Sequence, residues 1–373
     1  MDDAGSDGGA VTAPIRVLVV DGSDRGGIMR YSEMLCDELV AAGVDARLST
    51  AAAGRSRGAP ALPKIAWGDE VLGMGRARFY ARRLVETARR SVALLVAVAR
   101  VRPDVVHVQT GITARFDPIL LTVLHRFVPI VATVHDVVPF EGGDAASDRQ
   151  FDRLRHADVI VVHTPGDVDL VRRGLPGASV EVVRPASAYA AVPGGRAAAR
   201  ERLGLGDDPI VLLLGIMRPY KGIELRVRAW PAEHAARPDA GLWLVGSLCD
   251  PFADLDTLLG LPGVNGRIGW LEDEEMDLWA AAADVAVLPY TRGALSGVLQ
   301  QAAANGTPVL VSDALAEEAE RHGIEPLPYD AGAWTEGLLA ALTNPPPPPA
   351  EPDRSRSGDA TRAIYERLLP PHP

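Results

Sequence analysis

A series of short apolar segments, in which hydrophobic residues follow one another without alternating with polar ones, constrains the fold of this chain most strongly. The first, residues 15–20, reads IRVLVV, and residues 210–214 read IVLLL. Comparable segments lie at residues 105–108, 129–134, 159–162, 180–183, 242–245, 285–288 and 309–311. An uninterrupted apolar strand is buried on both faces, which is typical of a parallel sheet covered by helices on each side. The sequence therefore predicts parallel sheets.

Helical patterns fill the stretches between these segments. Residues 29–42 carry apolar side chains such as Leu35 and Leu39 on one face and stop at Gly43, which suits a helix C-terminus. Residues 273–283 begin with an acidic first turn, which favours a helix N-terminus. The alternation of strand and helix through both halves predicts an α/β fold with doubly wound parallel sheets.

An Ala-, Gly- and Pro-rich stretch at residues 186–199 divides the predicted strands into about five before it and four after it. We therefore expect two Rossmann-like domains that face a cleft. The expected divisions are a disordered leader at residues 1–14, an N-terminal domain at 15–187, a C-terminal domain at 200–343, and a proline-rich spacer with a terminal helix at 344–373.

Charge and cysteine content exclude several classes of protein. The net charge of −11 argues against a general nucleic-acid binder. Cys36 and Cys249 are the only cysteines, so a disulfide framework and C-x-x-C metal or redox spacing are absent. The N-terminus lacks the basic and apolar regions of a signal peptide, and the longest apolar run, residues 92–99, is too short to span a bilayer. We expect a cytoplasmic protein.

Ligands of open parallel sheets bind beyond the carboxyl ends of the strands, so the loops at those ends are the candidate site. Gly26 and Gly27 follow the first strand, where backbone amides can approach a phosphate or sugar, although a simple tight turn explains them equally well. His135 follows the strand at 129–134 and either exchanges hydrogen bonds with a polar ligand or packs a turn.

Two loops of the second half carry groups suited to phosphate. Arg218 and Lys221 follow the strand at 210–214, and such a pair of cations either binds both phosphates of a diphosphate or forms solvated surface charge. Ser296 and Gly297 make a good helix N-cap and helix start, whose free amides suit a phosphate.

Together these loops resemble the retaining, nucleotide-sugar-dependent glycosyltransferases of the GT-B fold, in particular glycosyltransferase family 4 (glycosyl transferases group 1). The resemblance covers residues 16–369, with the motifs in the family's order. They are RPDVVHVQ, VATVHDVVP and HADVIVVHT, then LLLGIMRPYKG, WLVGS, IGWLEDEEMDLWAAAADVAVLPY and SGVLQQAAANGTPV. The resemblance implies an N-terminal acceptor domain, a C-terminal nucleotide-sugar donor domain, and a last helix that returns to the first domain.

The resemblance also implies roles for individual residues. Arg218 and Lys221 would bind the donor diphosphate and neutralise the leaving group, and His135 would face the donor sugar near the reacting carbon. The implied donor-binding residues are Gly26, Gly27, Ser296, Gly297, Gln301, Trp270 and Leu271, the last two near the base. No metal and no further cofactor are implied, because the Arg/Lys pair replaces a divalent cation.

The implied activity is transfer of a sugar from a UDP- or GDP-type donor to a hydroxyl group, with retention, on a small-molecule, polysaccharide or lipid-linked acceptor. Two glutamates common in the family fall at Gly293 and Gln301; the glutamine keeps hydrogen-bonding groups without charge. These departures keep open an alternative, a catalytically degenerate partner protein that binds a nucleotide sugar or stabilises another transferase. They also count against a nucleotide-sugar epimerase, and the lack of G-x-G-x-x-G counts against a nicotinamide-dependent enzyme.

One stretch stands out by its charge. From Arg76 to Arg102 there are eight arginines and one acidic residue, Glu86, with Phe79, Tyr80 and Leu84 interleaved. The stretch is either a solvated arginine-rich helix or a weak peripheral contact with anionic lipid at the inner face of the membrane.

Overall fold

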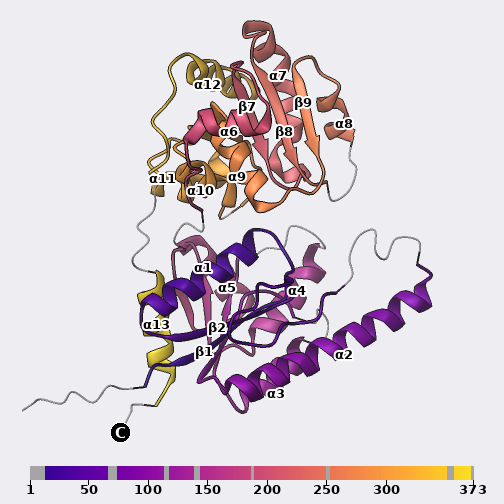
Figure 1. The fold of residues 1–373 in the computed structure, drawn as a ribbon, viewed down its shortest axis with the longest axis vertical. Coiled ribbons are helices and arrows are strands. Elements are labelled where there is room, and N and C mark those ends of the chain that lie inside the picture. The colour runs from indigo at the N-terminus through magenta and orange to yellow at the C-terminus, as the bar shows by residue number, and fades with distance from the viewer. Residues whose placement is uncertain are drawn as a thin grey trace, which may run out of the picture.

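The computed structural model of the chain describes residues 13–65, 74–112, 117–137, 143–185, 189–248, 253–293, 295–350 and 357–370. It forms two domains, each a parallel sheet with helices on both faces, stacked one above the other in Figure 1. The predicted fold class, two doubly wound Rossmann-like domains, is confirmed. Most of the expected leader at 1–14 lies outside the described residues, as do parts of the stretches 186–199 and 344–373.

The N-terminal domain has a six-stranded sheet in the order β2-β1-β3-β4-β5-β6. Its strands are β1 (Arg16–Asp21), β2 (Asp45–Thr50), β3 (Val105–Val108), β4 (Ile130–Thr133), β5 (Val159–Val162) and β6 (Val180–Val182). Its helices are α1 (Gly27–Ala41), α2 (Arg76–Val101), α3 (Asp117–His125), α4 (Gly143–Leu154) and α5 (Pro165–Gly174). Each strand pairs in parallel with its neighbour, so all carboxyl ends lie at one edge of the sheet.

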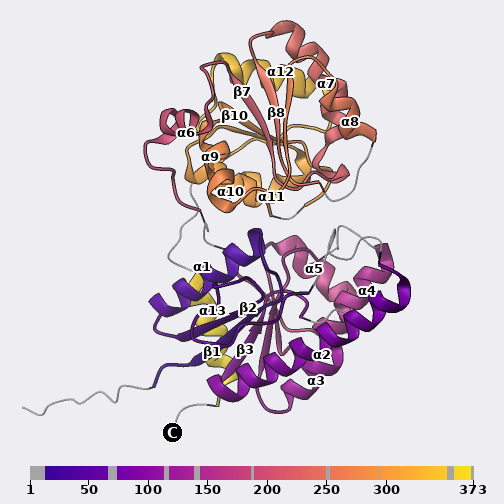
Figure 2. The same cartoon turned by 45° about the vertical axis from the view of Figure 1, so that its right-hand side comes forward.

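The C-terminal domain has a five-stranded sheet in the order β11-β10-β7-β8-β9. Its strands are β7 (Ile210–Leu214), β8 (Gly241–Gly246), β9 (Val264–Ile268), β10 (Val285–Leu288) and β11 (Val309–Val311). Its helical elements are α6 (Gly195–Leu203), η3 (Pro219–Lys221), α7 (Ile223–Ala236), α8 (Ala253–Leu259), α9 (Asp273–Ala282), α10 (Gly297–Ala304), η4 (Asp313–Leu315), α11 (Ala316–Arg321) and α12 (Ala331–Thr343). Figure 2 shows the same stacking of this domain over the first after a turn of the view.

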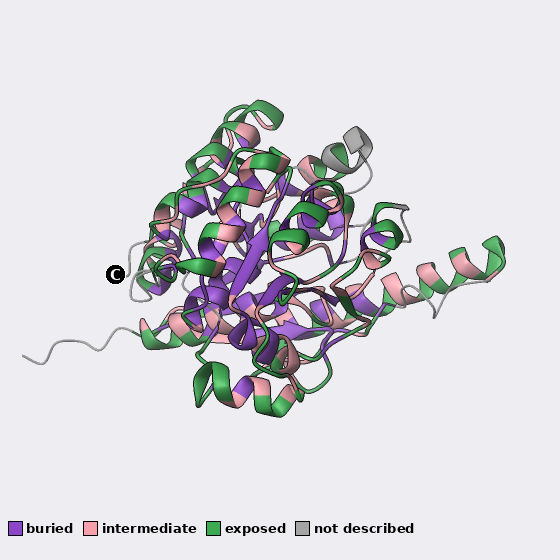
Figure 3. Ribbon diagram, turned by 90° about the horizontal axis from the view of Figure 1, so that it is seen from above, coloured by how far each residue is buried: buried purple, intermediate pink, exposed green. Residues whose placement is uncertain are grey.

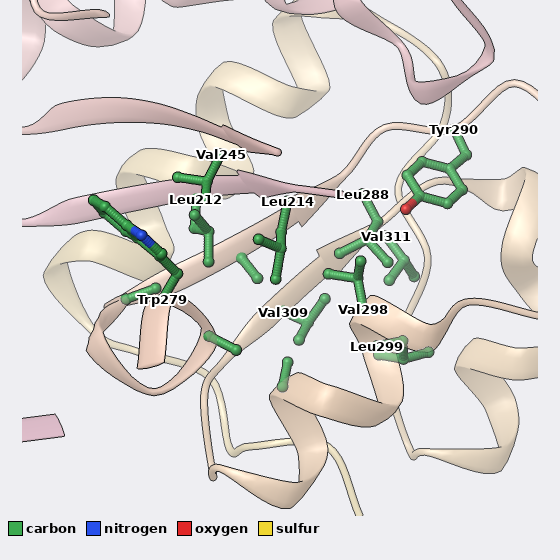
Figure 4. Packing of buried hydrophobic residues seen from close by; sticks show 14 of the residues in the cluster. Leu212, Leu214, Val245, Trp279, Leu288, Tyr290, Val298, Leu299, Val309 and Val311 are labelled. Atoms are coloured by element: carbon green, nitrogen blue, oxygen red, sulfur yellow. The ribbon is translucent and has the colours of Figure 1, made fainter. Parts of the chain in front are cut away.

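The uninterrupted apolar strands are buried on both faces, as predicted. In β7, Leu212 and Leu214 pack on one side of the sheet against α9 and α10, while Val211 and Leu213 pack on the other. Figure 4 shows the first of these clusters, with Trp279 of α9 closing it. Figure 3 shows the strands as the buried centre of both domains. Full burial of one such leucine contributes roughly 1.5–3 kcal/mol to stability.

The two strands that the sequence did not reveal, β2 and β9, both lie at the edge of a sheet. Their sequences, DARLST and VNGRI, mix polar and apolar residues, because an edge strand is covered less completely than a central one. The N-terminal sheet therefore has six strands where we expected five, and the C-terminal sheet has five where we expected four.

The terminal helix α13 (Ser357–Leu368) returns to the N-terminal domain, as predicted, and lies beside α1 (Figures 1 and 2). Tyr365 reaches the core, where its hydroxyl lies 2.6 Å from Nδ1 of the buried His107 on β3. Nε2 of His107 lies 2.7 Å from Oγ1 of Thr133. Both ring nitrogens are thus satisfied, so His107 is a core residue that ties α13 to the sheet.

Candidate functional site

The carboxyl ends of the two sheets face each other and enclose a cavity of about 400 Å³ lined by both domains. A second cavity of about 270 Å³ adjoins it and shares Gly27, Asp136, Tyr189, Tyr220 and Gly297. Such a cleft, opposite the strand ends of an α/β sheet, is the usual ligand position in this architecture.

All of the predicted site residues line this cleft. The larger cavity is lined by Gly26, Gly27, Arg218, Lys221, Trp270, Leu271, Ser296, Gly297 and Gln301. His135 and Gly293 line the smaller one. Their roles toward a ligand stay predictions. Within the described residues, no group of three or more His, Cys, Asp or Glu side chains is arranged to hold a metal ion.

Lys221 lies at the end of η3, just after β7, with its ammonium buried at the cavity wall. Its Nζ donates to the carbonyl of Leu214 at 3.0 Å and to the hydroxyl of Tyr290 at 2.6 Å, and it lies 4.6 Å from the Tyr290 ring centre. The pKa of Lys221 is lowered to about 8, mainly by burial and also by Arg218, while Tyr220 acts in the opposite direction. An anion in the cavity would compensate this burial, because its negative charge favours the protonated form of Lys221.

The backbone after Lys221 needs a glycine. Gly222 has a φ of 76° and is the N-cap of α7, and a Cβ atom there would lie 1.8 Å from the carbonyl oxygen of Pro289. The turn therefore passes directly beneath the end of β10, and this close approach holds Lys221 against Tyr290.

Asp136 is a site residue that the sequence analysis did not select. It lines both cavities, immediately after His135. Burial raises its pKa to about 6, as does Asp167, while Arg218 and Arg292 act in the opposite direction. The rule that selected His135, a polar residue at the carboxyl end of a strand, applies to Asp136 as well and would have found it.

The N-terminus of α10 opens onto the cleft. Oγ of Ser296 accepts from the backbone N–H of Leu299 at 3.4 Å, and the backbone N–H of Ser296 donates to Oε2 of Glu318 at 2.6 Å. A Cβ at Gly297 would lie 2.7 Å from the Tyr189 hydroxyl. The first residue of α10 is therefore a glycine, because Tyr189 occupies the space that a side chain would need. The first-turn amides that these two bonds do not use can bind an anion.

An ion-pair network that joins the domains borders the cavity. Arg30 of α1 donates from Nη1 and Nη2 to the carboxylate of Asp277 on α9 at 3.0 and 2.9 Å, and its Nε lies 3.0 Å from Asp273. Burial alone would lower the pKa of Arg30, but the two carboxylates outweigh it and raise that pKa. The guanidinium also lies 4.9 Å from the ring centre of Tyr189. Sequence reasoning missed this network, because its partners are far apart along the chain.

Gln301 joins the same network, since its Nε2 donates to Oδ1 of Asp277. The carboxylate thus fixes the amide, with the nitrogen toward Asp277. At the other end of the cleft, the guanidinium of Arg25 lies 4.3 Å above the ring of Trp270, so both domains contribute to the region predicted to hold the base.

His135 is held by a second histidine. Its Nδ1 lies 3.2 Å from Nε2 of His163, whose Nδ1 lies 3.0 Å from the carbonyl oxygen of Val183. Burial lowers the pKa of His163 to about 4 and that of His135 well below its usual value, so both rings are neutral. The carbonyl requires the proton on Nδ1 of His163, and His135 therefore donates from Nδ1 and presents Nε2 as an acceptor. The nearest atom of Gln109 to this Nε2 is Oε1, at 3.2 Å, and exchanging the amide oxygen and nitrogen lets the Nε2–H of Gln109, which otherwise has no partner, donate to His135.

Comparison with known proteins assigns both halves of the chain. A family model described as Glycosyltransferase Family 4 matches residues 25–186, and one described as Glycosyl transferases group 1 matches residues 208–344.

Two curated relatives align with parts of the chain. A GDP-mannose-dependent alpha-(1-6)-phosphatidylinositol monomannoside mannosyltransferase of Mycolicibacterium smegmatis is 34% identical over 149 residues, which are 36% of this chain and 38% of that protein. A D-inositol 3-phosphate glycosyltransferase of Thermobispora bispora is 30% identical over 186 residues, 46% of this chain and 42% of that protein. The aligned part is thus less than half the length of either relative.

Among solved structures, a sucrose-phosphate synthase from Thermosynechococcus elongatus superposes with a TM-score of 0.64 at 20% identity, covering 95% of this chain and 97% of that one. This likeness shows the fold. The two-domain arrangement of this chain is therefore the GT-B architecture.

Proposed function

Because the chain belongs to glycosyltransferase family 4, we propose that it transfers a sugar from a nucleoside diphosphate sugar to a hydroxyl group, with retention of configuration and without a metal ion. The observation that carries the proposal is the convergence of Lys221, Arg218 and the N-terminus of α10 on one cavity. Two cations and free amides from separate loops are the groups that a diphosphate requires.

The chemistry that these groups support is electrostatic. As the bond between C1 of the sugar and the phosphate oxygen breaks, negative charge grows on the diphosphate, and Lys221, Arg218 and the α10 amides are placed to stabilise it. The acceptor oxygen then bonds to C1 on the face that the diphosphate leaves, and its proton passes to a phosphate oxygen. The products are the glycoside and the nucleoside diphosphate.

His135 and Asp136 would face the sugar, since both line the smaller cavity that adjoins the diphosphate region. Neutral His135, with its Nε2 held by Gln109, would face the sugar with its ring, and the carboxyl of Asp136 would bind a sugar hydroxyl. Gln301 would accept a ribose hydroxyl through its oxygen, since its nitrogen is held by Asp277. The base would lie on Trp270 beside Leu271.

The printed names of the relatives narrow the candidates for donor and acceptor. One relative is GDP-mannose-dependent, and both act on inositol-containing molecules. We therefore propose a GDP- or UDP-type donor and a polyol acceptor, either a small molecule, a polysaccharide or a lipid-linked sugar, used on the cytoplasmic side of the membrane. No described helix is long and apolar enough to cross a bilayer.

The test is proton NMR of GDP-mannose and UDP-glucose, each incubated with the protein, inositol phosphates and EDTA. The proposal expects a product with the anomeric configuration of the donor, and no product from Lys221→Met. Lys64→Met is the matched control, because Lys64 and Lys221 are the only lysines in the sequence and Lys64 is exposed. An inverted product would refute retention. Binding of the donor without transfer or hydrolysis would favour the alternative, a catalytically degenerate partner protein. That alternative is supported by the lack of a side chain at Gly293, which lines the smaller cavity.

A further inference from the structure

Helix α2 is unusual in its length and in how little of it is packed. Its 26 residues span roughly 39 Å, and its N-terminal part projects beyond the body of the domain in Figures 1 and 3. Only Arg90, Leu94, Ala97 and Val101 are buried, and the last three join the cluster under β1 and β3. These residues define one narrow face toward the protein.

The opposite face of α2 is apolar although it points to solvent. With a turn of about 100° per residue, the sector from about 40° to about 180° around the helix axis from Leu94 carries no charged side chain along the whole helix. Leu84 is 62% exposed, Val92 is 59% exposed and Leu95 is 43% exposed. The strip, which we call the α2 outer face, consists of Ala77, Tyr80, Ala81, Leu84, Val85, Ala88, Val92, Leu95 and Ala99. A solvent-facing helix is normally polar here, and an apolar patch of this kind marks a binding surface.

Arginines line one edge of the α2 outer face. Arg78, Arg89 and Arg100 are exposed along this edge, and Arg82 lies in the same row beside Glu86. The basic row occurs in a chain whose net charge is −11, so it is a local feature rather than the general character of the surface. An apolar strip with a cationic border is the pattern of a helix that lies in the interface of an anionic membrane.

Helix α3 adds exposed apolar residues next to α2. Leu120, Leu121 and Leu124 of α3 pack into the same buried cluster as α2, and both views place α3 beside the C-terminal part of α2 (Figures 1 and 2). On its other side, Ile119 is 65% exposed and Phe127, just after the helix, is 81% exposed. Full exposure of such side chains is costly unless another surface covers them.

We propose that the α2 outer face docks on an anionic lipid surface, with the helix axis in the plane of the membrane and the arginine row at the phosphate head groups. The buried side of the same helix supplies Arg90 to a cavity of about 380 Å³ that shares Ser23 with the donor cleft. Docking by α2 would therefore leave this cavity on the protein side of the helix, across from the lipid surface. The proposal does not depend on the reaction that the cleft performs.

The experiment is flotation of the full-length protein with vesicles of phosphatidylcholine alone or mixed with phosphatidylglycerol, at low and high salt. We expect binding to the mixed vesicles only, and loss of binding at high salt. Arg78→Gln combined with Arg89→Gln should lower the partition coefficient about 30-fold, because each arginine near an anionic surface contributes about fivefold. Leu84→Ser combined with Val92→Ser should lower it by roughly tenfold or more.

The matched control removes two exposed arginines elsewhere, Arg172→Gln on α5 with Arg228→Gln on α7, and should leave vesicle binding unchanged. All four positions in the test variants are exposed, so circular dichroism should show an unchanged fold. Equal binding to both kinds of vesicle, or equal loss in the control, would overturn the proposal. So would a dimer in sedimentation equilibrium that Leu84→Ser dissociates, because the α2 outer face would then be covered by a second copy of the chain.

Discussion

The buried ammonium of Lys221 leads to a prediction about protons. In the free protein, burial lowers the pKa of this lysine from 10.5 to about 8. A diphosphate that reaches Nζ compensates the burial and moves the pKa back toward its ordinary value. Nucleoside diphosphate binding must therefore take up a proton wherever the free lysine is partly deprotonated.

The size of the effect follows from the two pKa values. At pH 8 about half of the free protein lacks the proton, so binding should take up about half a proton, and at pH 7 only about a tenth. Above pH 8 the affinity should fall about tenfold per pH unit, until the pKa of the complex is reached. Binding must take up protons rather than release them, because the complex holds the proton of Lys221 more tightly than the free protein does.

Calorimetry in two buffers with different heats of ionisation measures the proton uptake directly. Because the sequence has only two lysines, labelling lysine with ¹³C at the ε carbon gives two signals, one of them from the exposed Lys64. The Lys221 signal should titrate near pH 8 without ligand and well above pH 8 with it. A Kd that stays constant from pH 7 to 9.5, or proton uptake that persists in Lys221→Met, would refute the reasoning.

Three further predictions concern the framework of the cleft. Arg30→Gln and Asp277→Asn should show a coupling of about 1 kcal/mol in a double-mutant cycle measured by thermal unfolding, because the ion pair is mostly buried and bidentate. Additive effects of the two substitutions would mean that this ion pair does not hold the domains together. Burial raises the pKa of Glu318 to about 8, so the native state loses stability relative to the unfolded state as pH rises from 4.5 to 8. The Glu318→Gln variant should therefore have a higher melting temperature than the wild type at pH 8 but not at pH 4.5. Tyr365→Phe should destabilise the N-terminal domain by about 1–3 kcal/mol in urea unfolding, because His107 loses a buried partner, and an unchanged midpoint would contradict this.

The sequence was sufficient to predict the central strands and most of the residues that line the cleft. Burial on both faces forces segments such as 210–214 to be apolar throughout, so these strands are recognisable without any partner. The carboxyl ends of those strands then locate the ligand loops, which is why Lys221 and Ser296 were found. The edge strand β9 was missed because its residues, VNGRI, do not need to be apolar.

The contacts between the domains could not be predicted from local pattern. Arg30 and Asp277 lie on helices of different domains, and each alone looks like an ordinary surface charge. The hydrogen bond from Gln301 to Asp277 joins α10 and α9 within the C-terminal domain, and it too became visible only in the structure. The arginines of α2 were visible in the sequence, but the exposure of Leu84 and Val92 required the structure, which shows the side of the helix that packs.

The most direct test of the account is calorimetric titration of the full-length protein with GDP, UDP, ADP and the matching monophosphates, all in EDTA. The account predicts that one nucleoside diphosphate binds without metal and that its monophosphate binds much more weakly, because Lys221, Arg218 and the α10 amides together need both phosphates. If no diphosphate binds, or if mono- and diphosphate bind equally, the cleft is not a diphosphate site and the central claim is wrong.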